Sequence, residues 1–366
     1  MGEFQFLTIG TAVLCTLVAG LAVTRLSIAV GYRLGFVVKP RLYGRCESSI
    51  TYLGGPALAV TSIAGFLVFG RSNDLVRTIL LAGIAVLILG FVDDRLSASA
   101  GLTPRFRVIV EVAIAAAAWR MGVSAYSTGP VWVDALLTVV FLVAGMNAFN
   151  LVDNMDGVAG STAAAVSFGI MALALAGNQP QFAVLAACIG GATAAFLCFN
   201  FARPRVYLGD AGSLFLGLVL SGMALTINAG FQPPGNLLAA AVIFAVPFTD
   251  TATRQLSRWV SGSSPFNILG GTDHLSHRLV DVGFSPGEAA RLHGIASLLA
   301  GAAAGIAALM LSLAPLLIAF CVFAGVGLMF VWLAWSRRPL PGLPAAGTDP
   351  VPFGLHMSVD PLRAEA

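Results

Sequence analysis

The sequence predicts an all-α protein that crosses a membrane with about 10–11 helices, its N-terminus outside the cell and its polar loops in the cytoplasm. Of its 366 residues, 58% are hydrophobic and only 10% are charged, with a mean hydropathy of +0.89. A soluble domain carries about 25% charged residues, so a soluble globule of this size is excluded. The apolar runs are continuous and do not alternate, which favours helices over the strands of a membrane barrel.

Charged residues interrupt the apolar runs and mark where each predicted helix ends. The first run follows only Glu3, whereas a cleaved signal peptide needs a basic start, so we keep this run as a membrane helix. In chain order, the eleven predicted helices span residues 5–24, 53–70, 78–92, 108–121, 130–149, 158–177, 182–200, 213–230, 237–253, 292–313 and 315–335. Residues 1–335 are therefore expected to form one membrane-embedded domain, followed by a disordered, Pro-rich cytoplasmic tail over 336–366.

The basic residues orient these helices, because cytoplasmic loops are enriched in lysine and arginine. With the N-terminus outside, 17 basic residues fall on the inner loops and the tail, and only Arg71, Arg77 and Arg120 fall outside. The net charge of +3 therefore reflects membrane topology and not nucleic-acid binding. The five cysteines lie mostly in apolar runs and predict neither a disulfide framework nor a clustered metal site.

Acidic residues gather on the same inner side, where they predict a polar site, because charges in a membrane protein are costly and usually functional. Asp93 and Asp94 end the third predicted helix. Two adjacent carboxylates repel each other and need a metal, a basic partner or water, although they could also simply end the helix. Segment 147–157 places several amide and acid side chains among apolar residues, and such oxygens suit magnesium or a base edge.

Two further segments carry features of phosphate binding. Small residues surround Asp210 at a predicted helix start, which lets a metal-bound phosphate approach the backbone amides. The longest inner loop, 254–291, contains His274, His277 and Arg278. Its arginines favour phosphate, while a zinc site on the two histidines and a solvated loop remain alternatives.

Together, these segments resemble the polyprenyl-phosphate N-acetylhexosamine-1-phosphate transferases, integral membrane enzymes that include the bacterial undecaprenyl-phosphate GlcNAc-1-phosphate transferases and the phospho-N-acetylmuramoyl-pentapeptide transferase. The resemblance spans about residues 40–300. Its motifs, in the family's order, are Gly54-Gly55, Asp93-Asp94, Asn147-x-x-Asn150-x-x-Asp153-x-x-Asp156-Gly157, Gly209-Asp210-Ala211-Gly212-Ser213 and His274-x-x-His277-Arg278. The chain departs from the family at Glu111, where glutamine is frequent and where an i, i+4 pair with Arg107 is expected.

The resemblance implies transfer of a sugar 1-phosphate, by default GlcNAc 1-phosphate, from a UDP-sugar to undecaprenyl or another polyprenyl phosphate, with release of UMP. This reaction would be the first membrane step of a cell-envelope glycan pathway, on the cytoplasmic face of the inner (plasma) membrane. The sugar itself cannot be read from the sequence. A homodimer stays open, and no nucleic acid is expected as a partner.

The resemblance also implies the roles of individual residues. The expected cofactor is Mg²⁺, or Mn²⁺ in its place, on Asp210 with Asn150 as second ligand. Asp156 matches the family's position that reads uracil, and Tyr207 matches the aromatic position that stacks on uracil. Arg107 matches the position that holds phosphate, and His274, His277 and Arg278 match the pyrophosphate-binding loop. Asp93, Asp94 and Asp153 are the candidate catalytic residues, and our hypothesis is that Asp93 receives or orients the proton of the acceptor phosphate. A covalent phospho-aspartate is the alternative mechanism.

Two other classes remain as alternatives. A secondary transporter would also have many helices and buried acids, but its site would lie near the middle of the membrane and not at one face. A CDP-alcohol phosphotransferase is suggested by Asp153-x-x-Asp156-Gly157, but the sequence continues into an apolar helix without that family's further aspartates.

Overall fold

The computed structural model describes residues 3–38, 49–96, 101–125, 129–201, 204–260 and 274–336. Within these ranges the chain forms 13 helices and one small sheet, which confirms the predicted all-α class. The helices are α1 (Glu3–Leu34), α2 (Gly54–Phe69), α3 (Asp74–Leu96), α4 (Pro104–Arg120), α5 (Val131–Val152), α6 (Val158–Ala176), α7 (Pro180–Asn200), α8 (Gly209–Thr226), α9 (Gly235–Ile243), α10 (Ala245–Val260), α11 (Leu275–Asp281), α12 (Pro286–Met310) and α13 (Ala314–Ser336). Most of the predicted tail, residues 337–366, lies outside the described residues.

The helices have the length and composition of a polytopic membrane protein. Seven of those described are long and apolar enough to cross a membrane, or eight if α9 and α10 together form one bent span, and α2 and the described part of α13 are apolar but shorter. Large apolar side chains are exposed on the outer helices, among them Leu67 on α2, Ile88 on α3 and Leu309 on α12. In water such a surface would be unfavourable, whereas in lipid it matches the solvent.

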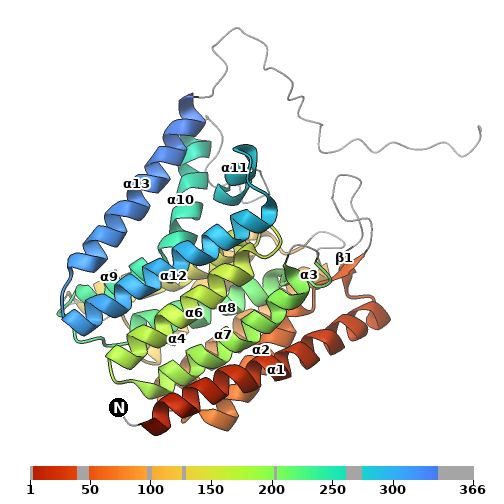
Figure 1. Cartoon of the computed structure of the whole chain (residues 1–366), viewed down its shortest axis with the longest axis horizontal. Helices are drawn as coiled ribbons and strands as arrows, with labels where there is room; N and C mark the ends of the chain where they lie inside the picture. Colours follow the sequence, from red (N-terminus) through yellow and green to blue (C-terminus); the bar gives the residue numbers. More distant parts are fainter. Residues whose placement is uncertain are drawn as a thin grey trace, which may run out of the picture.

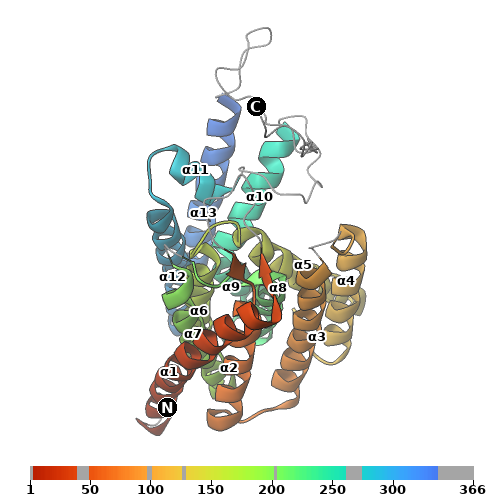
Figure 2. The same cartoon turned by 90° about the vertical axis from the view of Figure 1, so that its right-hand side faces the viewer.

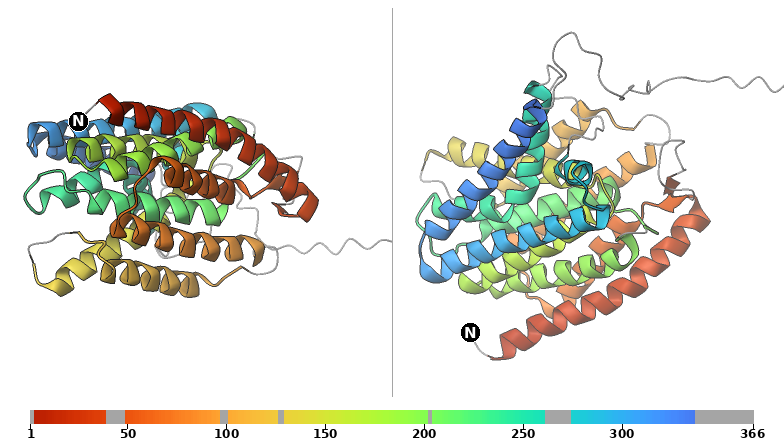
Figure 3. Two further views of the ribbon diagram at one scale, coloured as in Figure 1. Left: turned by 90° about the horizontal axis from the view of Figure 1, so that it is seen from below. Right: turned by 45° about the horizontal axis from the view of Figure 1, so that its top comes forward.

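The bundle is built around α8, whose residues from Ala211 to Thr226 are all buried. Helices α3, α5 and α2 pack directly against it, and α6, α7 and α12 form an adjoining layer. Figure 3 shows these helices lying roughly side by side along the bundle. Between α6 and α12, Gly169 and Gly301 face each other so closely that a Cβ on either would lie 2.6–2.7 Å from the other's Cα. Small residues at helix contacts are typical of membrane bundles.

One end of the bundle collects the polar residues, and we call it the site end. The C-terminal ends of α3 and α5 meet the N-terminal ends of α4 and α8 there, as the bonds among Asp93, Asn150, Arg107 and Asp210 show. The start of α1 lies at the opposite end (Figure 1). The three arginines predicted outside lie away from the site end, in the α2–α3 turn, on the first turns of α3 and at the end of α4.

A two-stranded antiparallel sheet closes the bundle near the site end. Strand β1 (Val37–Val38) pairs with β2 (Ile50–Thr51), and Thr51 forms a parallel bridge with Val206. The Tyr207 amide donates a hydrogen bond of 2.8 Å to the Thr51 carbonyl. These bonds fix the segment that leads into α8.

The helix boundaries differ from the predicted ones in ways that matter for the site. The predicted helix over 237–253 is wrong as a single helix, because the chain breaks at Phe244 and the axes of α9 and α10 differ by 74°. Phe244 packs against the rings of Phe141, Phe149 and Phe248, so aromatic packing holds this break. Helix α11 was not predicted, and α8 begins at Gly209 instead of 213. Helices α10, α11 and α13 rise together beside the bundle in Figure 2.

Candidate active site

Arg107 lies at the centre of a charged network at the site end. The residue is 9% exposed, and its guanidinium group donates to Asn150 Oδ1 at 2.8 Å, Asp210 Oδ2 at 3.2 Å and Asp93 Oδ2 at 3.4 Å. Its Nε lies 3.2 Å from Glu111 Oε1, which confirms the predicted i, i+4 pair. Four helices, α3, α4, α5 and α8, therefore converge on one positive charge, and the buried ion pairs gain strength from the low dielectric.

Amide side chains complete this network. Asn150 donates through Nδ2 to Asp210 Oδ1 at 2.6 Å and to Ser213 Oγ at 3.0 Å. Asn147, one turn earlier on α5, donates to Glu111 Oε2 at 2.5 Å, and Glu111 is fully buried. Asp210 and Asn150, which are predicted as metal ligands, thus contact each other directly. Sequence reasoning assigned no role to Ser213, although it lies in the quoted Gly209–Ser213 motif, one helical turn from Asp210.

The two adjacent aspartates of α3 face different neighbours. Asp93 is 5% exposed and accepts from the Leu102 amide at 2.7 Å as well as from Arg107. Asp94 accepts from the backbone amides of Asp210 at 2.9 Å and Ala211 at 3.1 Å. The repulsion expected between these carboxylates is thus offset by separate partners, a guanidinium group for one and a helix N-terminus for the other.

The glycine pair at the start of α2 holds the start of α8. The amides of Gly54 and Gly55 donate to the carbonyls of Tyr207 and Leu208 at 3.1 and 3.0 Å. A Cβ on Gly55 would lie only 2.3 Å from the Gly212 backbone nitrogen. These glycines therefore allow the two backbones to meet, which positions the segment that carries Asp210.

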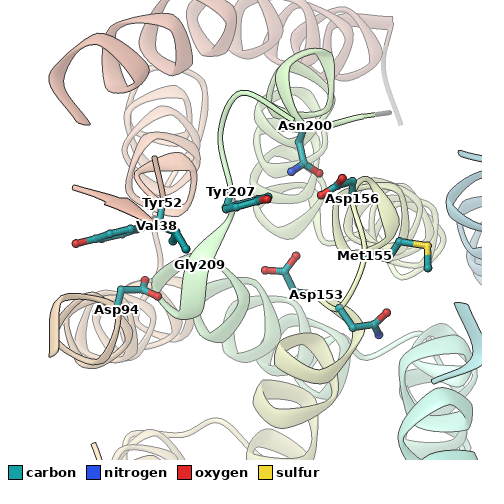
Figure 4. Close-up of a pocket in the computed structure, with 10 residues that line it drawn as sticks. Val38, Tyr52, Asp94, Asp153, Met155, Asp156, Asn200, Tyr207 and Gly209 are labelled. Carbon is teal, nitrogen blue, oxygen red and sulfur yellow. The ribbon is translucent and has the colours of Figure 1, made fainter. Parts of the chain in front are cut away.

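A cavity of about 340 Å³ opens next to this network (Figure 4). It is lined by residues from β1, the β2–α2 connection, α3, the α5–α6 connection, α7, the segment before α8 and the first residue of α8, namely Val38, Tyr52, Asp94, Asp153, Asn154, Met155, Asp156, Asn200, Tyr207 and Gly209. In Figure 4 the Asp153 carboxylate points toward the middle of the opening, with Tyr207 on one side of it and Asp94 and Asp156 to its left and right. The predicted residues Asp94, Asp153, Asp156 and Tyr207 therefore share one cavity.

Asp153 is the carboxylate of this cavity with the most unusual electrostatics. Its side chain has no hydrogen-bond or ion-pair partner among the residues that the structure describes. Burial, together with the negative charges of Asp210, Asp94 and Asp156, raises the pKa of Asp153 to about 8. Burial also raises the pKa of Asp156. A carboxyl group with a pKa near neutral pH can take up or release a proton during a reaction.

The predicted histidine segment forms the start of α11, where His274 is held by Asp250 of α10. His274 Nδ1 lies 2.8 Å from Asp250 Oδ2, and the Leu275 amide donates to Asp250 Oδ1 at 2.6 Å. Both residues are almost fully buried, at 3% and 0% exposure. On the same two helices, Arg278 donates to Ser257 Oγ at 2.8 Å. The sequence analysis assigned no role to Asp250, because its partner His274 lies 24 residues away.

One contact joins this segment to the cavity. Ser276 donates to Asn154 Oδ1 at 2.5 Å, and Asn154 lines the cavity. His277 lies beside His274, with ring centroids 6.4 Å apart. The three predicted residues His274, His277 and Arg278 thus lie at the edge of the site but do not line the described cavity. Residues 261–273 of the predicted loop 254–291 fall outside the described residues.

Asn200 is a cavity residue that the sequence analysis missed. Its Oδ1 accepts from the Gly157 amide at 2.8 Å, and its Nδ2 donates to the Val206 carbonyl at 2.9 Å. Gly157 has a φ of +79°, which favours glycine at that position. Asn200 therefore connects the segment that carries Asp153 and Asp156 to the segment that carries Tyr207. The available signal was a single amide at the end of an otherwise apolar run.

With this geometry established, comparison with known proteins gives a consistent result. Residues 76–228 match glycosyl transferase family 4. The chain is 26% identical over 293 residues to a "Probable undecaprenyl-phosphate N-acetylglucosaminyl 1-phosphate transferase" of Bacillus subtilis, covering 78% of this chain and 81% of the relative. An undecaprenyl-phosphate alpha-N-acetylglucosaminyl 1-phosphate transferase of Yersinia pestis is also 26% identical, over 78% and 80% of the two chains. A decaprenyl-phosphate N-acetylglucosaminephosphotransferase of Mycolicibacterium smegmatis is 28% identical, over 69% and 70%.

Residues 76–228 of the chain are thus similar to glycosyl transferase family 4. The matched residues of this family include α3, α4, α5 and the start of α8, which are the four elements that converge on Arg107. They also include Asp153, Asp156 and Tyr207 of the cavity. The matching family and the relatives named above include neither of the two alternatives considered from the sequence, a secondary transporter and a CDP-alcohol phosphotransferase.

Proposed function

We propose that this protein transfers a sugar 1-phosphate, most simply GlcNAc 1-phosphate, from a UDP-sugar to a polyprenyl phosphate and releases UMP. The observation that carries the proposal is the convergence of the family's motif residues, distant in sequence, around Arg107 and one cavity at the site end. In the reaction, an oxygen of the lipid phosphate attacks the sugar-bearing phosphorus of the donor, and the bond from that phosphorus to the bridging oxygen of UMP breaks. Such a step requires in-line positioning and neutralisation of charge more than covalent help.

The residues present fit a divalent cation at Asp210 and Asn150. Asp93 Oδ2, Asp210 Oδ2 and Asn150 Oδ1 converge on the guanidinium group of Arg107, so oxygens of the kind that Mg²⁺ prefers already surround one positive charge. Among the described residues, no three His, Cys, Asp or Glu side chains gather as a metal site by themselves. Mg²⁺ commonly uses one or two carboxylates together with water and substrate phosphates, which suits this arrangement. When bound, the cation would stabilise the negative charge that develops on the leaving UMP.

The donor is proposed to bind between Tyr207 and the α5–α6 connection. An aromatic ring offers a stacking surface for uracil, and the Asp156 carboxyl group offers hydrogen bonds to its edge. The neighbouring α11 segment, attached through Ser276 and Asn154, brings His274, His277 and Arg278 toward the donor's phosphates. Histidine and arginine side chains suit that role because they donate charge-assisted hydrogen bonds to phosphate oxygens.

For the acceptor's proton, the geometry favours Asp153 over Asp93, the residue of our initial hypothesis. Both oxygens of Asp93 are engaged, one by the Leu102 amide and the other by Arg107. Asp153 lines the cavity, and its pKa of about 8 suits a group that takes up a proton at neutral or slightly alkaline pH. We therefore propose Asp153 as the general base and Arg107 as the group that orients the phosphates.

The proposed location is the inner (plasma) membrane, with the site end in the cytoplasm, where UDP-sugars are made. Two features support this orientation: the 17 basic residues assigned to the inner loops and tail, against 3 outside, and the opposite placement of Arg71, Arg77 and Arg120 in the bundle.

A direct assay tests the proposal. Purified enzyme in detergent is incubated with undecaprenyl phosphate and a panel of UDP-sugars, UMP release is measured, and the lipid product is identified by mass. We expect one UDP-N-acetylhexosamine to give UMP and a polyprenyl diphosphate sugar, and EDTA to stop the reaction until Mg²⁺ or Mn²⁺ is restored. Asp210→Ala should abolish turnover. Absence of UMP with every donor would refute the reaction, while turnover that survives EDTA would refute the cation alone.

A further inference from the structure

The N-terminus of α8, which carries Asp210, has no side-chain cap from the residue at its N-cap position. A helix leaves its first backbone amides without partners inside the helix, and a side chain near the N-cap usually satisfies one of them. Here the N-cap position is Leu208, which offers no side-chain hydrogen bond. The amides of the first turn must therefore find their partners elsewhere.

Asp94 supplies these partners from a distant part of the chain. Its Oδ1 accepts from the Asp210 amide at 2.9 Å, and its Oδ2 accepts from the Ala211 amide at 3.1 Å. The carboxylate thus uses both oxygens on consecutive amides of the first turn, where the helix dipole favours a negative charge. The residues that meet are 116 and 117 positions apart in the sequence.

Two glycines make this contact sterically feasible. Gly209 has a φ of +72°, and a Cβ there would lie 2.6 Å from Asp94 Oδ2. Gly90, one turn before Asp94 on α3, approaches the same peptide, and its Cβ would lie 2.4 Å from the Asp210 carbonyl oxygen. A side chain at Gly90 would force the end of α3 and the start of α8 apart, and one at Gly209 would displace the Asp94 carboxylate.

We infer that Asp94 is a positioning residue that caps α8 and thereby fixes the side chain of Asp210. The amides of Asp210 and Ala211 are then already bonded to a carboxylate of the protein, so substrate phosphate binds elsewhere in the site. Asp93, the neighbouring residue, bonds Leu102 and Arg107 instead, so the aspartate pair ties α3 to α8 through one member and to α4 through the other. The consequence for turnover rests on the proposed function, whereas the cap itself does not.

Hydrogen–deuterium exchange of the full-length protein in detergent, without added metal or substrate, tests the cap. In Asp94→Ala, the amides of Asp210 and Ala211 should exchange about tenfold faster or more, since each loses a bond to a charged acceptor. Asp94→Asn should retain an oxygen acceptor and give an intermediate rate. Asp93→Ala is the matched control, which should speed exchange at the Leu102 amide and leave the start of α8 unchanged.

A second readout separates positioning from direct chemistry. If Asp94 acts through Asp210, Mn²⁺ binding measured by paramagnetic resonance should weaken in the order wild type, Asp94→Asn, Asp94→Ala, in parallel with the exchange rates. Gly209→Ala should reproduce the fast exchange while keeping Asp94, and it tests the inference if Asp94→Ala does not fold. Unchanged exchange at Asp210 and Ala211 in these variants would overturn the inference, whatever the enzyme's substrate.

Discussion

Replacement of Gly55 by alanine tests how closely α2 and α8 must approach to hold the site. The added Cβ would lie 2.3 Å from the Gly212 nitrogen, 2.4 Å from the Gly212 Cα and 2.6 Å from the Leu208 carbonyl oxygen. These are backbone atoms, so no side chain can rotate away. Ordinary van der Waals contact begins near 3.4 Å, and the two helices must therefore separate by about 1 Å.

This separation has two expected costs. Overpacking of a close contact destabilises a protein by about 1–3 kcal/mol, and the bond from the Gly55 amide to Leu208 would lengthen as well. Asp210 lies between Leu208 and Gly212, so it would move with them. A displacement of about 1 Å at a catalytic group lowers the rate by about 100-fold.

The assay is UMP release from UDP-GlcNAc with undecaprenyl phosphate, combined with the thermal unfolding temperature of the same detergent-solubilised protein. Gly10→Ala on α1 is the matched control, because a Cβ at Gly10 meets no atom within 4 Å. We expect a turnover number about 100-fold lower and a lower unfolding temperature for Gly55→Ala, and neither change for Gly10→Ala. Wild-type activity and stability in Gly55→Ala would refute the close approach of the two helices.

Three further predictions concern the charged groups. Asp153 must be ionised to accept a proton, so UMP release by the wild type should rise with pH through about 8. A bound divalent cation would shift this rise to lower pH, because its positive charge reduces the pKa of Asp153. Asp153→Asn should be slow and should lack the rise, and an unchanged pH profile in this variant would exclude Asp153 as the base. Arg107→Lys keeps one positive charge but loses the fork that bonds three oxygens, so kcat/KM should fall about tenfold or more, and wild-type kinetics would contradict that arrangement. Asp250→Asn removes the negative charge beside His274 but keeps an acceptor for Leu275, and it should raise KM for the UDP-sugar more than it lowers kcat. Ser257→Ala, which removes the acceptor of the Arg278 bond and leaves the pair of His274 and Asp250 in place, is the comparison.

Much of the site's composition could be predicted from the sequence because each part depends on local information. A membrane span needs a continuous apolar run, so charged residues mark most helix ends, and basic residues mark one side. The pair Arg107–Glu111 follows from helical spacing alone, and the structure has it at 3.2 Å. The dense polar segment 147–157 also stands out, because buried polar side chains are expensive in such a protein.

Other features depend on packing between distant segments. The break between α9 and α10 could not be predicted from hydropathy, because the sequence is apolar on both sides of Phe244. Packing of Phe244 against aromatic neighbours holds the two helix axes in different directions. The role of Asn200 could not be predicted from the sequence, since its two hydrogen bonds reach residues that lie 43 and 6 positions away. Asp250 became a partner of His274 only through the approach of α11.

The sequence by itself determined that this protein is a helical membrane protein with a polar site on one side, because hydrophobicity and charge are properties of each segment. The tertiary structure decided what each acid does there. Asp93 and Asp94 are adjacent and chemically identical, yet one bonds Arg107 and the other bonds the start of α8. Their different partners follow from the packing of α3 between α4 and α8, since the strength and direction of a hydrogen bond depend on atoms that only the folded chain brings together.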